Sequence, residues 1–345
     1  MAAFAGPSTL PTAPYSSNFA QALSSELHEV ESKAEFGASW SLGSLLGRGH
    51  SAKIYLCHGR DGSQAACKMA RREPGLSWSR LSNTFEREAA LLRRCAHPCI
   101  VQILGLYRGP QELALVLSLA PSGDCQQLLQ RHGALSERAA NAIAQQTCAA
   151  LDHLHTHARC LHRDVKLENV LVVETGGQAA ANIKVVLCDL GHSCTMEPPH
   201  VGGASCDDGF RGTKGYVAPE VTNGLPWTTA SDVWSLGVVY YALLANELLR
   251  WKSGAPDVST KTSRAFSHVT PPCKMRIKAL LLVEPSERLH LSLLNQMLLA
   301  AIHPQQPPTP TTAAAATAAA IMGASQTFTV APPDGMLDVT DPSVP

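Results

Sequence analysis

The first third of the chain is dominated by short apolar runs of the kind that form strands. Turn residues separate the earliest of these runs, at Gly47-Arg48-Gly49 and at Asp61-Gly62. Strands are therefore predicted at residues 41–46, 52–57, 64–70, 100–106 and 113–119. One helix is expected among them, at residues 83–95, because apolar side chains recur there every three or four residues.

Longer apolar stripes with helical spacing follow after residue 121. Ser136 is a suitable N-cap for a long helix that carries Ile143, Thr147, Leu151 and Leu154 on one face. Two short strands are expected at residues 170–173 and 183–187, and further helices at about residues 229–246, 272–282 and 289–301. Strands first and helices afterwards predict an α+β fold with two lobes.

The two ends of the chain differ in composition from this central region. Residues 1–39 are rich in Ala, Ser and Pro and are expected to form a flexible extension, with a short helix near residues 19–30. Residues 304–345 contain no Lys or Arg and are expected to be a disordered Pro/Thr/Ala-rich tail; its two P-x-x-P registers could dock an SH3 module or act as a plain spacer. One folded domain is therefore predicted over residues 40–303.

Composition argues against several kinds of partner. Lys+Arg and Asp+Glu are both 28, so neither nucleic acid nor a membrane surface is expected as the main partner. No apolar run could span a bilayer, and the first positive charge is Lys33, so a cytoplasmic or nuclear location without a signal peptide is predicted. The 11 cysteines are scattered, Cys95 and Cys99 make a poor zinc half-site, and reduced, mostly buried thiols are expected.

The most specific chemistry lies in the stretch His162-Arg163-Asp164-Val165-Lys166-Leu167-Glu168-Asn169. A carboxylate at Asp164 can orient a substrate hydroxyl and accept its proton. An ammonium at Lys166 can neutralise a migrating phosphate, and an amide oxygen at Asn169 can hold a magnesium ion. The pattern H-R-D-x-K-x-x-N is that of the catalytic loop of protein kinases.

Residues 46–54 resemble the Gly-rich loop of the same family, G-x-G-x-x-G-x-V. Glycines let the backbone fold closely over phosphates and direct its amides at them. Ala52 stands in place of the third glycine, and a methyl group there is expected to slow nucleotide exchange and not to abolish binding. Taken alone, a structural β-turn would explain this motif equally well.

The run Ala65-Ala66-Cys67-Lys68 matches the strand V-A-I-K, whose lysine holds the α- and β-phosphates of the nucleotide. Glu88, on the following predicted helix, is the expected anionic partner of Lys68. A solvated surface residue would be the ordinary interpretation of either one alone. Together with the accompanying motifs, an ion pair of Lys68 and Glu88 in the nucleotide site is the favoured interpretation.

Three further motifs follow in the chain. Asp189-Leu190-Gly191 stands in the place of D-F-G, so Asp189 is expected to bind magnesium. Residues 212–220 resemble G-T-x-x-Y-x-A-P-E, in which Thr213 contacts the catalytic residues and Glu220 pairs with Arg288. Asp232 matches the aspartate that anchors the catalytic loop, although an N-cap role is the alternative.

By these motifs the chain resembles the eukaryotic protein kinase superfamily from about residue 40 to 303. The motifs resemble those of Ser/Thr kinases, and their residues are most similar to those of the calcium/calmodulin-dependent kinase group. The resemblance implies a two-lobed kinase fold, with a small β-rich N-lobe at about 40–117 that carries one main helix and a larger, mainly helical C-lobe at about 121–303. It implies ATP and Mg²⁺ as cofactors and protein Ser/Thr hydroxyls as acceptors. Lys68, Glu88, Asp164, Lys166 and Thr213 would be catalytic, Asn169 and Asp189 would bind the metal, and Asp232, Glu220 and Arg288 would be structural.

The resemblance also implies a set of ATP contacts. Leu117 would be the gatekeeper behind the adenine, residues 118–120 the hinge, and Asp124 would meet the ribose. The full expected set is Leu46, Gly47, Arg48, Gly49, His50, Ser51, Ala52, Lys53, Ile54, Ala66, Lys68, Leu117, Ser118, Ala120, Asp124 and Leu171. Asp124 and Glu168 also match positions that favour Arg three residues before the phosphoacceptor.

Several departures from the family pattern leave alternatives open. Gly209 occupies the usual phosphosite, and Asp207 or Asp208 could replace the phosphate by pairing with Arg163 or could form a solvated acidic turn. Ser193, Thr195 and Ser205 are other candidate phosphosites. The segment 246–270 lacks the usual Pro-Phe pair, which puts its docking helix in doubt, and no Lys or Arg follows Arg288, so no C-terminal calmodulin-binding helix is expected.

Two rival functions follow from the same motifs. Ala52 and Leu190 give some support to a pseudokinase that binds nucleotide and partners without efficient catalysis. A small-molecule or lipid kinase on a related fold is the other alternative. Residues 212–220 argue against it, because in the family this segment forms the platform that receives protein substrates.

Overall fold

The computed structural model describes residues 36–49, 52–72, 77–175, 183–196, 212–249, 251–252, 255–256 and 266–303. The expectations for both terminal extensions, for His50 and Ser51, and for Ser205, Asp207, Asp208 and Gly209 therefore fall outside the described residues. The described part begins at Phe36, four residues before the predicted start of the folded domain.

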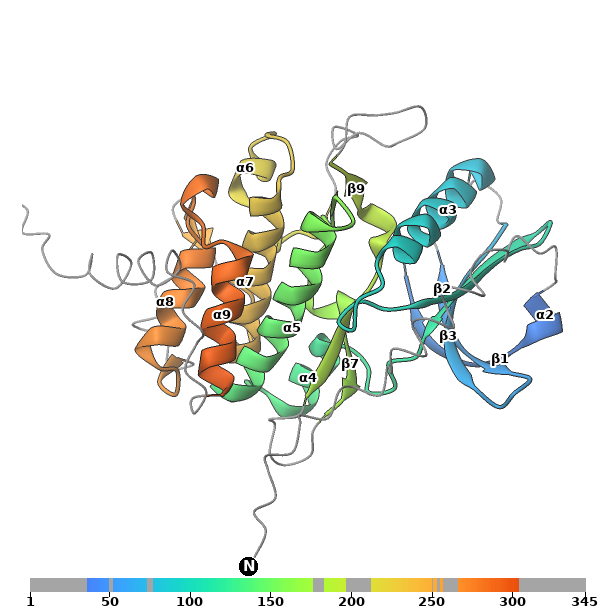
Figure 1. Cartoon of the computed structure of the whole chain (residues 1–345), viewed down its shortest axis with the longest axis horizontal. Helices are drawn as coiled ribbons and strands as arrows, with labels where there is room; N and C mark the ends of the chain where they lie inside the picture. Colours follow the sequence, from blue (N-terminus) through green and yellow to red (C-terminus); the bar gives the residue numbers. More distant parts are fainter. Residues whose placement is uncertain are drawn as a thin grey trace, which may run out of the picture. The chain divides into compact units, whose positions relative to one another are not determined.

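The N-lobe is built on one antiparallel sheet of five strands (Figure 1). In spatial order these are β1 (Trp40–Arg48), β2 (Lys53–Gly59), β3 (Gln64–Arg71), β5 (Glu112–Ser118) and β4 (Ile103–Arg108). All five correspond to predicted strands. β4 begins three residues later than predicted because Ile100 forms an isolated bridge with Leu187 of the C-lobe.

One long helix, α3 (Trp78–Arg94), packs against this sheet. It begins five residues before the predicted start, with Ser77 at the N-cap position and Leu81 added to the buried stripe. Glu88 is buried on the same helix and is 1% exposed. A carboxylate at such a position needs a partner, and the site described below provides it.

The opposite face of the sheet is covered by a second apolar cluster. A short helix, α2 (Phe36–Ser39), contributes Phe36, whose ring packs edge-on against Tyr107 with 5.7 Å between ring centroids. The other buried members are Cys57, Ala65, Cys67, Met69, Ala114 and Val116. Since side chains alternate along a strand, Cys67 and Met69 face this cluster while Lys68 faces the other way.

The C-lobe is a bundle of helices around α7 (Thr229–Ala245). The residues of α7 from Ser231 to Ala245 are all buried, as expected for a helix that is apolar on all sides. α5 (Glu137–Thr156) and α8 (Pro271–Leu280) pack against it, and α9 (Leu291–Ile302) packs against α5. α4 (Cys125–His132) and α6 (Pro219–Thr222) lie at the edges of the bundle. The predicted N-cap is confirmed, because Ser136 accepts a hydrogen bond from the amide of Ala139 at 3.3 Å.

Short strands hold the loops that carry the motifs. β7 (Val170–Glu174) and β8 (Lys184–Leu187) correspond to the two predicted short strands, and they pair with each other. β6 (Cys160–Leu161) and its partner β9 (Cys194–Thr195) were too short to be detected by periodicity. Between residues 246 and 270 the described residues contain the strand pair β10 (Trp251–Lys252) and β11 (Ala255–Pro256) and no α-helix.

Two further predictions concern the whole described part. Nine of its cysteines are free thiols, as expected, but Cys194 is disulfide-bonded, so the prediction of reduced thiols is wrong at that position. Among the described residues, none of the helices has the length and apolar character needed to cross a bilayer.

Candidate active site

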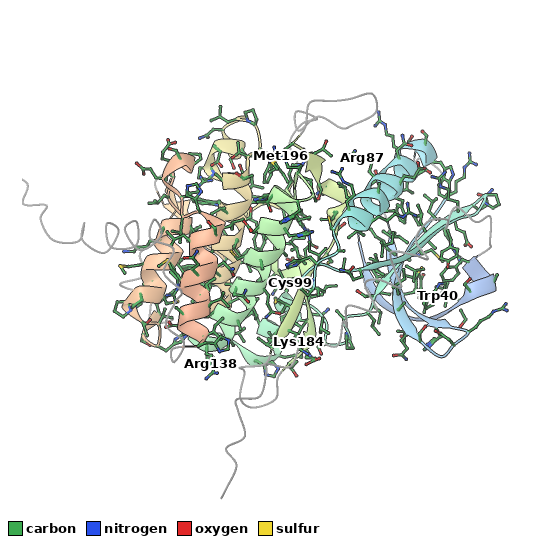
Figure 2. All side chains as sticks on the ribbon, in the orientation of Figure 1. Trp40, Arg87, Cys99, Arg138, Lys184 and Met196 are labelled. Carbon is green, nitrogen blue, oxygen red and sulfur yellow. The ribbon has the colours of Figure 1, made fainter. Side chains whose placement is uncertain are left out.

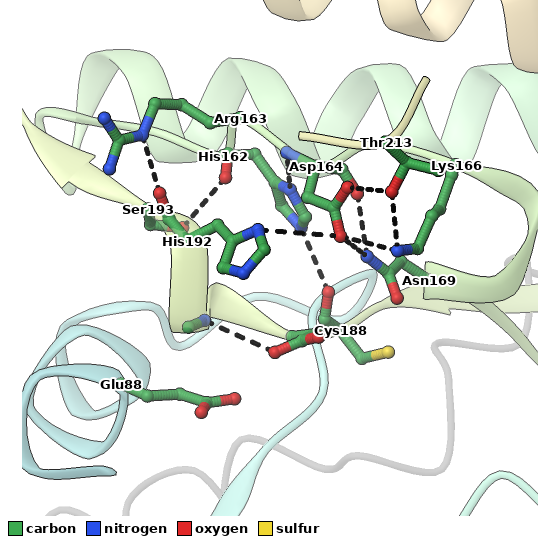
Figure 3. A network of polar contacts seen from close by, with 12 residues as sticks. Glu88, His162, Arg163, Asp164, Lys166, Asn169, Cys188, His192, Ser193 and Thr213 are labelled. Atoms are coloured by element: carbon green, nitrogen blue, oxygen red, sulfur yellow. Dashed lines mark hydrogen bonds and ion pairs between the residues drawn. The ribbon is translucent and has the colours of Figure 1, made fainter. Parts of the chain in front are cut away.

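The catalytic loop runs from the end of β6 into η2 (Leu167–Asn169), a single turn of 3-10 helix (Figure 3). Asp164 is 4% exposed, and three side chains fix its carboxylate. Thr213 Oγ1 donates to Oδ1 at 2.7 Å, and Lys166 Nζ and Asn169 Nδ2 donate to Oδ2 at 2.7 and 3.1 Å. Lys166 also donates to Thr213 at 2.9 Å, so these side chains form one closed network around Asp164.

The backbone of this loop is anchored from α7. Asp232, which is completely buried, accepts hydrogen bonds from the amides of His162 and Arg163, both at 2.9 Å. Burial alone would raise the pKa of Asp232, but hydrogen bonds from His155 and the catalytic loop hold it below the usual value. Thr228, not Asp232, is the N-cap of α7, so the structure favours the anchoring role over the capping alternative.

His155, which the sequence did not single out, lies next to this anchor. Its Nε2 contacts Asp232 Oδ2 at 2.8 Å, and both side chains are buried. It therefore shares Asp232 with the loop amides and restricts the orientation of that carboxylate. His155 comes directly after Leu154 on the predicted helix, and its side chain is buried in the structure. A histidine at a buried helix position was the one sequence feature that could have indicated this contact.

The strained backbone at the site has a local cause. Arg163 and Asp189 both adopt left-handed conformations, with φ of 65° and 63°. Such conformations are unfavourable for non-glycine residues and persist where surrounding contacts enforce them. The Asp232 bond to the Arg163 amide and the bond from Arg163 Nε to the His192 carbonyl at 2.6 Å provide those contacts at the first position.

Lys68 lies between two carboxylates on the nucleotide side of the site. Its Nζ is 2.7 Å from Glu88 Oε2 and 2.8 Å from Asp189 Oδ1. Burial alone would lower the pKa of Lys68, but the two carboxylates raise it well above its usual range, so the side chain is cationic. Glu88 contacts Lys68, as the sequence predicted. Asp189 contacts the same ammonium group, which the sequence did not predict.

Two residues have the chemistry of a divalent-metal site. Burial would raise the pKa of Asp189, but Lys68 lowers it strongly, with smaller effects from His162 and His192, so the carboxylate is ionised. The Asn169 amide nitrogen is bound to Asp164, which leaves its oxygen as the free acceptor of that side chain. No group of three or more His, Cys, Asp or Glu among the described residues could hold a metal by itself. Two hard oxygen ligands suit a hard divalent cation.

The Gly-rich motif forms the turn between β1 and β2. Among its described residues the amide of Gly49 donates to the Ala52 carbonyl at 2.8 Å, and Ala52 is buried. Leu46, Arg48 and Lys53 are exposed, and Gly47 and Ile54 are partly buried. His50 and Ser51 are outside the described part.

The remaining expected nucleotide contacts lie along β3, β5 and the hinge. Leu117 is buried and pairs with Ala66 across the sheet, while Ser118 and Ala120 continue from β5. Asp124 caps α4 by accepting from the Gln127 amide at 2.8 Å and forms a bridge with Leu171. Burial raises the pKa of Asp124.

Leu190, His192 and Ser193 follow Asp189 in the chain and lie close to the site. Leu190, the substitute for Phe, is 2% exposed, and its turn η4 (Leu190–His192) contacts α3, as an apolar wedge requires. Ser193 is 1% exposed, so it is an unfavourable phosphosite in this conformation. The side chain of His192 lies beside the Asp164 carboxylate, with Nδ1 4.0 Å from Asp164 Oδ2 (Figure 3).

A sheet-based lobe with a buried lysine–glutamate pair, facing a loop that fixes one carboxylate, defines the protein kinase class. Comparison of the sequence agrees with this geometry: residues 40–299 match the protein kinase domain, and the chain belongs to that family. Protein kinases use ATP and a divalent metal ion.

Known kinases resemble the chain over much of its length. It is 31% identical over 266 residues to CBL-interacting serine/threonine-protein kinase 16 of Arabidopsis thaliana, which covers 73% of this chain and 55% of that protein. It is 30% identical over 268 residues to SNF1-related protein kinase catalytic subunit alpha KIN12 of the same plant, covering 75% and 50%. It is 32% identical over 211 residues to mitosis inducer protein kinase cdr1 of Schizosaccharomyces pombe, covering 61% and 32%.

The chain thus spans about half the length of the first two relatives. The predicted membership of the Ser/Thr protein kinase superfamily and the two-lobed fold are confirmed. Placement in the calcium/calmodulin-dependent group stays a prediction.

Proposed function

We propose that the chain is an active serine/threonine protein kinase that transfers the ATP γ-phosphoryl group to protein Ser or Thr hydroxyls. The observation that supports this most directly is the double contact of Lys68 with Glu88 and Asp189. Desolvating the Lys68 cation and the buried Glu88 carboxylate costs free energy that packing alone would avoid. Binding of nucleotide phosphates by Lys68 would explain why this costly charge cluster is present.

The proposed mechanism divides the work between the two halves of the site. Lys68, held by Glu88, positions the α- and β-phosphates. Asn169 and Asp189 would hold Mg²⁺, which when bound neutralises charge on the phosphate oxygens. Asp164 orients the acceptor hydroxyl and takes its proton, and Lys166 offsets charge in a loose transition state.

Nucleotide binding is proposed for the turn and the hinge. The backbone of residues 47–54 would cover the phosphates, and Ala66, Leu117 and Leu171 would enclose the adenine. The backbone of residues 118–120 would pair with its edge, and Asp124 would meet the ribose. Leu46, Ser118 and Ala120 complete the set of proposed contacts.

The decisive experiment compares wild type with Lys68→Ala and Asp164→Asn, using labelled ATP and a mixed Ser/Thr peptide pool. Lys184→Ala, which removes an exposed lysine paired with Glu174, serves as the matched control. Transfer by wild type and the control alone supports the enzyme. Equal background in all four proteins overturns the proposal, and retained nucleotide binding in that case supports the pseudokinase alternative.

We also propose a preference for basic residues on the substrate. Glu168 is exposed next to the catalytic residues, and Asp124 lies at the start of α4. Asp124→Asn with Glu168→Gln should reduce selection of Arg three residues before the acceptor on a peptide array. Asn is also a good N-cap, so the first change spares α4. An array that shows no Arg enrichment with wild type would contradict this preference.

A further inference from the structure

A groove of about 740 Å³ lies at one end of the N-lobe sheet, away from the proposed catalytic residues. Strand register explains its position, because the pairs Trp40–Gly59 and Ala65–Ser118 place the start of β1, the β2–β3 turn and the hinge at the same end of the sheet. Trp40 marks this region on the N-lobe (Figure 2).

The walls of the groove combine apolar surface with a few polar groups. Trp40, Leu104, Tyr107 and Leu119 supply the apolar part. The polar lining comes from Ser39, Arg60, Asp61, Ser63, Gln64, Gln102 and Ser118. Recognition sites commonly have this composition, with apolar area for affinity and a few polar groups for orientation.

One polar lining residue connects the groove to the proposed nucleotide site. The backbone amide of Gln102 donates to Ser118 Oγ in the hinge at 3.0 Å. Its side-chain nitrogen donates to the carbonyls of His97 and Ile100 at 3.0 and 2.7 Å, in the connection between α3 and β4. An occupant of the groove would therefore contact the hinge from behind and touch the residue that holds the α3–β4 connection.

The chain itself enters the folded domain at this groove. Ala38 and Ser39 of α2 form part of its lining, and Phe36 is already packed against Tyr107. The Trp40 indole nitrogen donates to the Tyr107 hydroxyl at 3.1 Å. The residues next to the N-terminal extension thus bind this face, and the 35 residues before Phe36 start at its wall.

The sequence of that extension contains a suitable ligand. Phe19, Leu23, Leu27 and Val30 are spaced by four, four and three residues, which is the pattern of one apolar helical face. Five residues, 31–35, separate this stretch from Phe36, and at about 3.5 Å per residue they could span the distance back to the groove. The extension contains four glutamates and one lysine. Arg60, the cation of the groove, is exposed and has no ion pair among the described residues.

We propose that residues 19–30 bind this groove within the same molecule. The apolar face would cover Trp40, Leu104 and Leu119, and Glu26 or Glu29 would lie near Arg60. The short connection to Phe36 keeps the segment at a millimolar effective concentration, so even a weak individual affinity suffices. The bound segment would brace the hinge, and the inference does not depend on catalysis.

Hydrogen exchange of the full chain tests this proposal. Leu23→Ser with Leu27→Ser should speed amide exchange in residues 102–107 and 112–119 by about tenfold, because an occupant shields these strands. Leu10→Ser, which lies outside the apolar face of the same extension, is the matched control and should leave exchange unchanged. Unchanged exchange in the double variant overturns the proposal.

A charge exchange tests the contact with Arg60. Arg60→Glu should speed exchange of the same strands, and adding Glu26→Lys with Glu29→Lys should restore protection. Arg80→Glu, an exposed position on α3, controls for the charge change. Protection that rises with protein concentration would indicate binding by a second copy and would overturn the intramolecular proposal. Failure to restore protection would also count against it.

Discussion

Glu220 and Arg288 lie 68 residues apart in the sequence and form a two-pronged ion pair in the C-lobe, with Nη1–Oε1 and Nη2–Oε2 distances of 2.7 and 2.6 Å. Both side chains are buried, and the Arg288 guanidinium lies 5.1 Å from the Trp234 ring centroid. Burial would raise the pKa of Glu220, but the bonds from Arg288 keep it below its usual value. The pair fastens the end of the substrate platform to the turn that precedes α9.

Breaking this pair should unfold the C-lobe more easily. Glu220→Gln leaves the buried Arg288 without a counter-charge, and we expect the free energy of unfolding to fall by about 3–5 kcal/mol. Urea titration followed by circular dichroism measures it. Glu174→Gln is the control, because it removes an exposed pair with Lys184 and should cost less than about 1 kcal/mol. Similar losses in both variants would contradict the structural role of Glu220.

Glu88→Gln should weaken catalysis through Lys68. Lys68 would keep Asp189 as its partner, but its ion pair with the carboxylate on α3 would be reduced to a contact with at most one neutral amide oxygen. We expect kcat/KM for ATP to fall by about 10–100-fold, since small displacements of a positioning group have effects of that size. Steady-state kinetics against ATP checks it. Glu86→Gln, on the same helix but in a surface pair with Arg108, should change kcat/KM less than twofold, or about 0.4 kcal/mol.

Thr213 separates a substrate-side contribution from a nucleotide-side one. Thr213→Val removes the donor to Asp164 and the acceptor for Lys166 while keeping the shape of the side chain. The acceptor would then meet a less constrained carboxylate, so we expect kcat to fall by about 10–100-fold with little change in the KM for ATP. Thr213→Ser retains the hydroxyl and should recover most of the rate. A rise in the KM for ATP with unchanged kcat would assign Thr213 to the wrong half of the site.

Motif spacing predicted the contacts that depend on side-chain chemistry. Lys68 with Glu88 and Glu220 with Arg288 could be anticipated because a buried charge requires a partner and the family pattern names it. The structure adds the geometry, in particular that Lys68 also reaches Asp189.

Features that rest on tertiary packing could not be predicted in the same way. Periodicity placed the start of α3 at residue 83, but the helix begins earlier, where Leu81 is part of the main apolar core and Trp78 packs against it. β6 and β9 have two residues each, too few for any periodic signal. His155 lay on an apolar helical face, and only the fold shows that it meets Asp232. The groove at Trp40 depends on strands distant in sequence.

Three imidazole rings stack on one another near the end of α5. His97 follows α3, and His153 and His157 lie at the end of α5, with ring centroids 5.0 and 4.8 Å apart. Burial lowers the pKa of His97 to about 4, with further lowering by His153 and His157 and a small opposing effect of Asp152. Burial likewise lowers the pKa of His153.

These shifts fix the direction of a pH effect on stability. The unfolded chain takes up protons at His97 and His153 near pH 6.5, whereas the folded chain resists uptake until about pH 4 at His97. The unfolded state therefore binds more protons in this window, and the stabilisation that is complete above pH 6.5 is lost as the pH falls towards 4. Because the His97 ring is partly solvated, we expect its contribution to fall by about 1 kcal/mol between pH 7 and 5.

His97→Asn tests this effect while preserving the local hydrogen bond. The Cys99 amide donates to His97 Nδ1 at 3.1 Å, and the Asn oxygen can accept in its place. Urea midpoints at pH 5, 6 and 7 should show a shallower pH dependence in this variant than in wild type. His132→Asn, which changes an exposed histidine at the end of α4, should keep the wild-type slope. If His97→Asn and wild type lose stability in parallel, the stacked histidines do not carry the acid sensitivity.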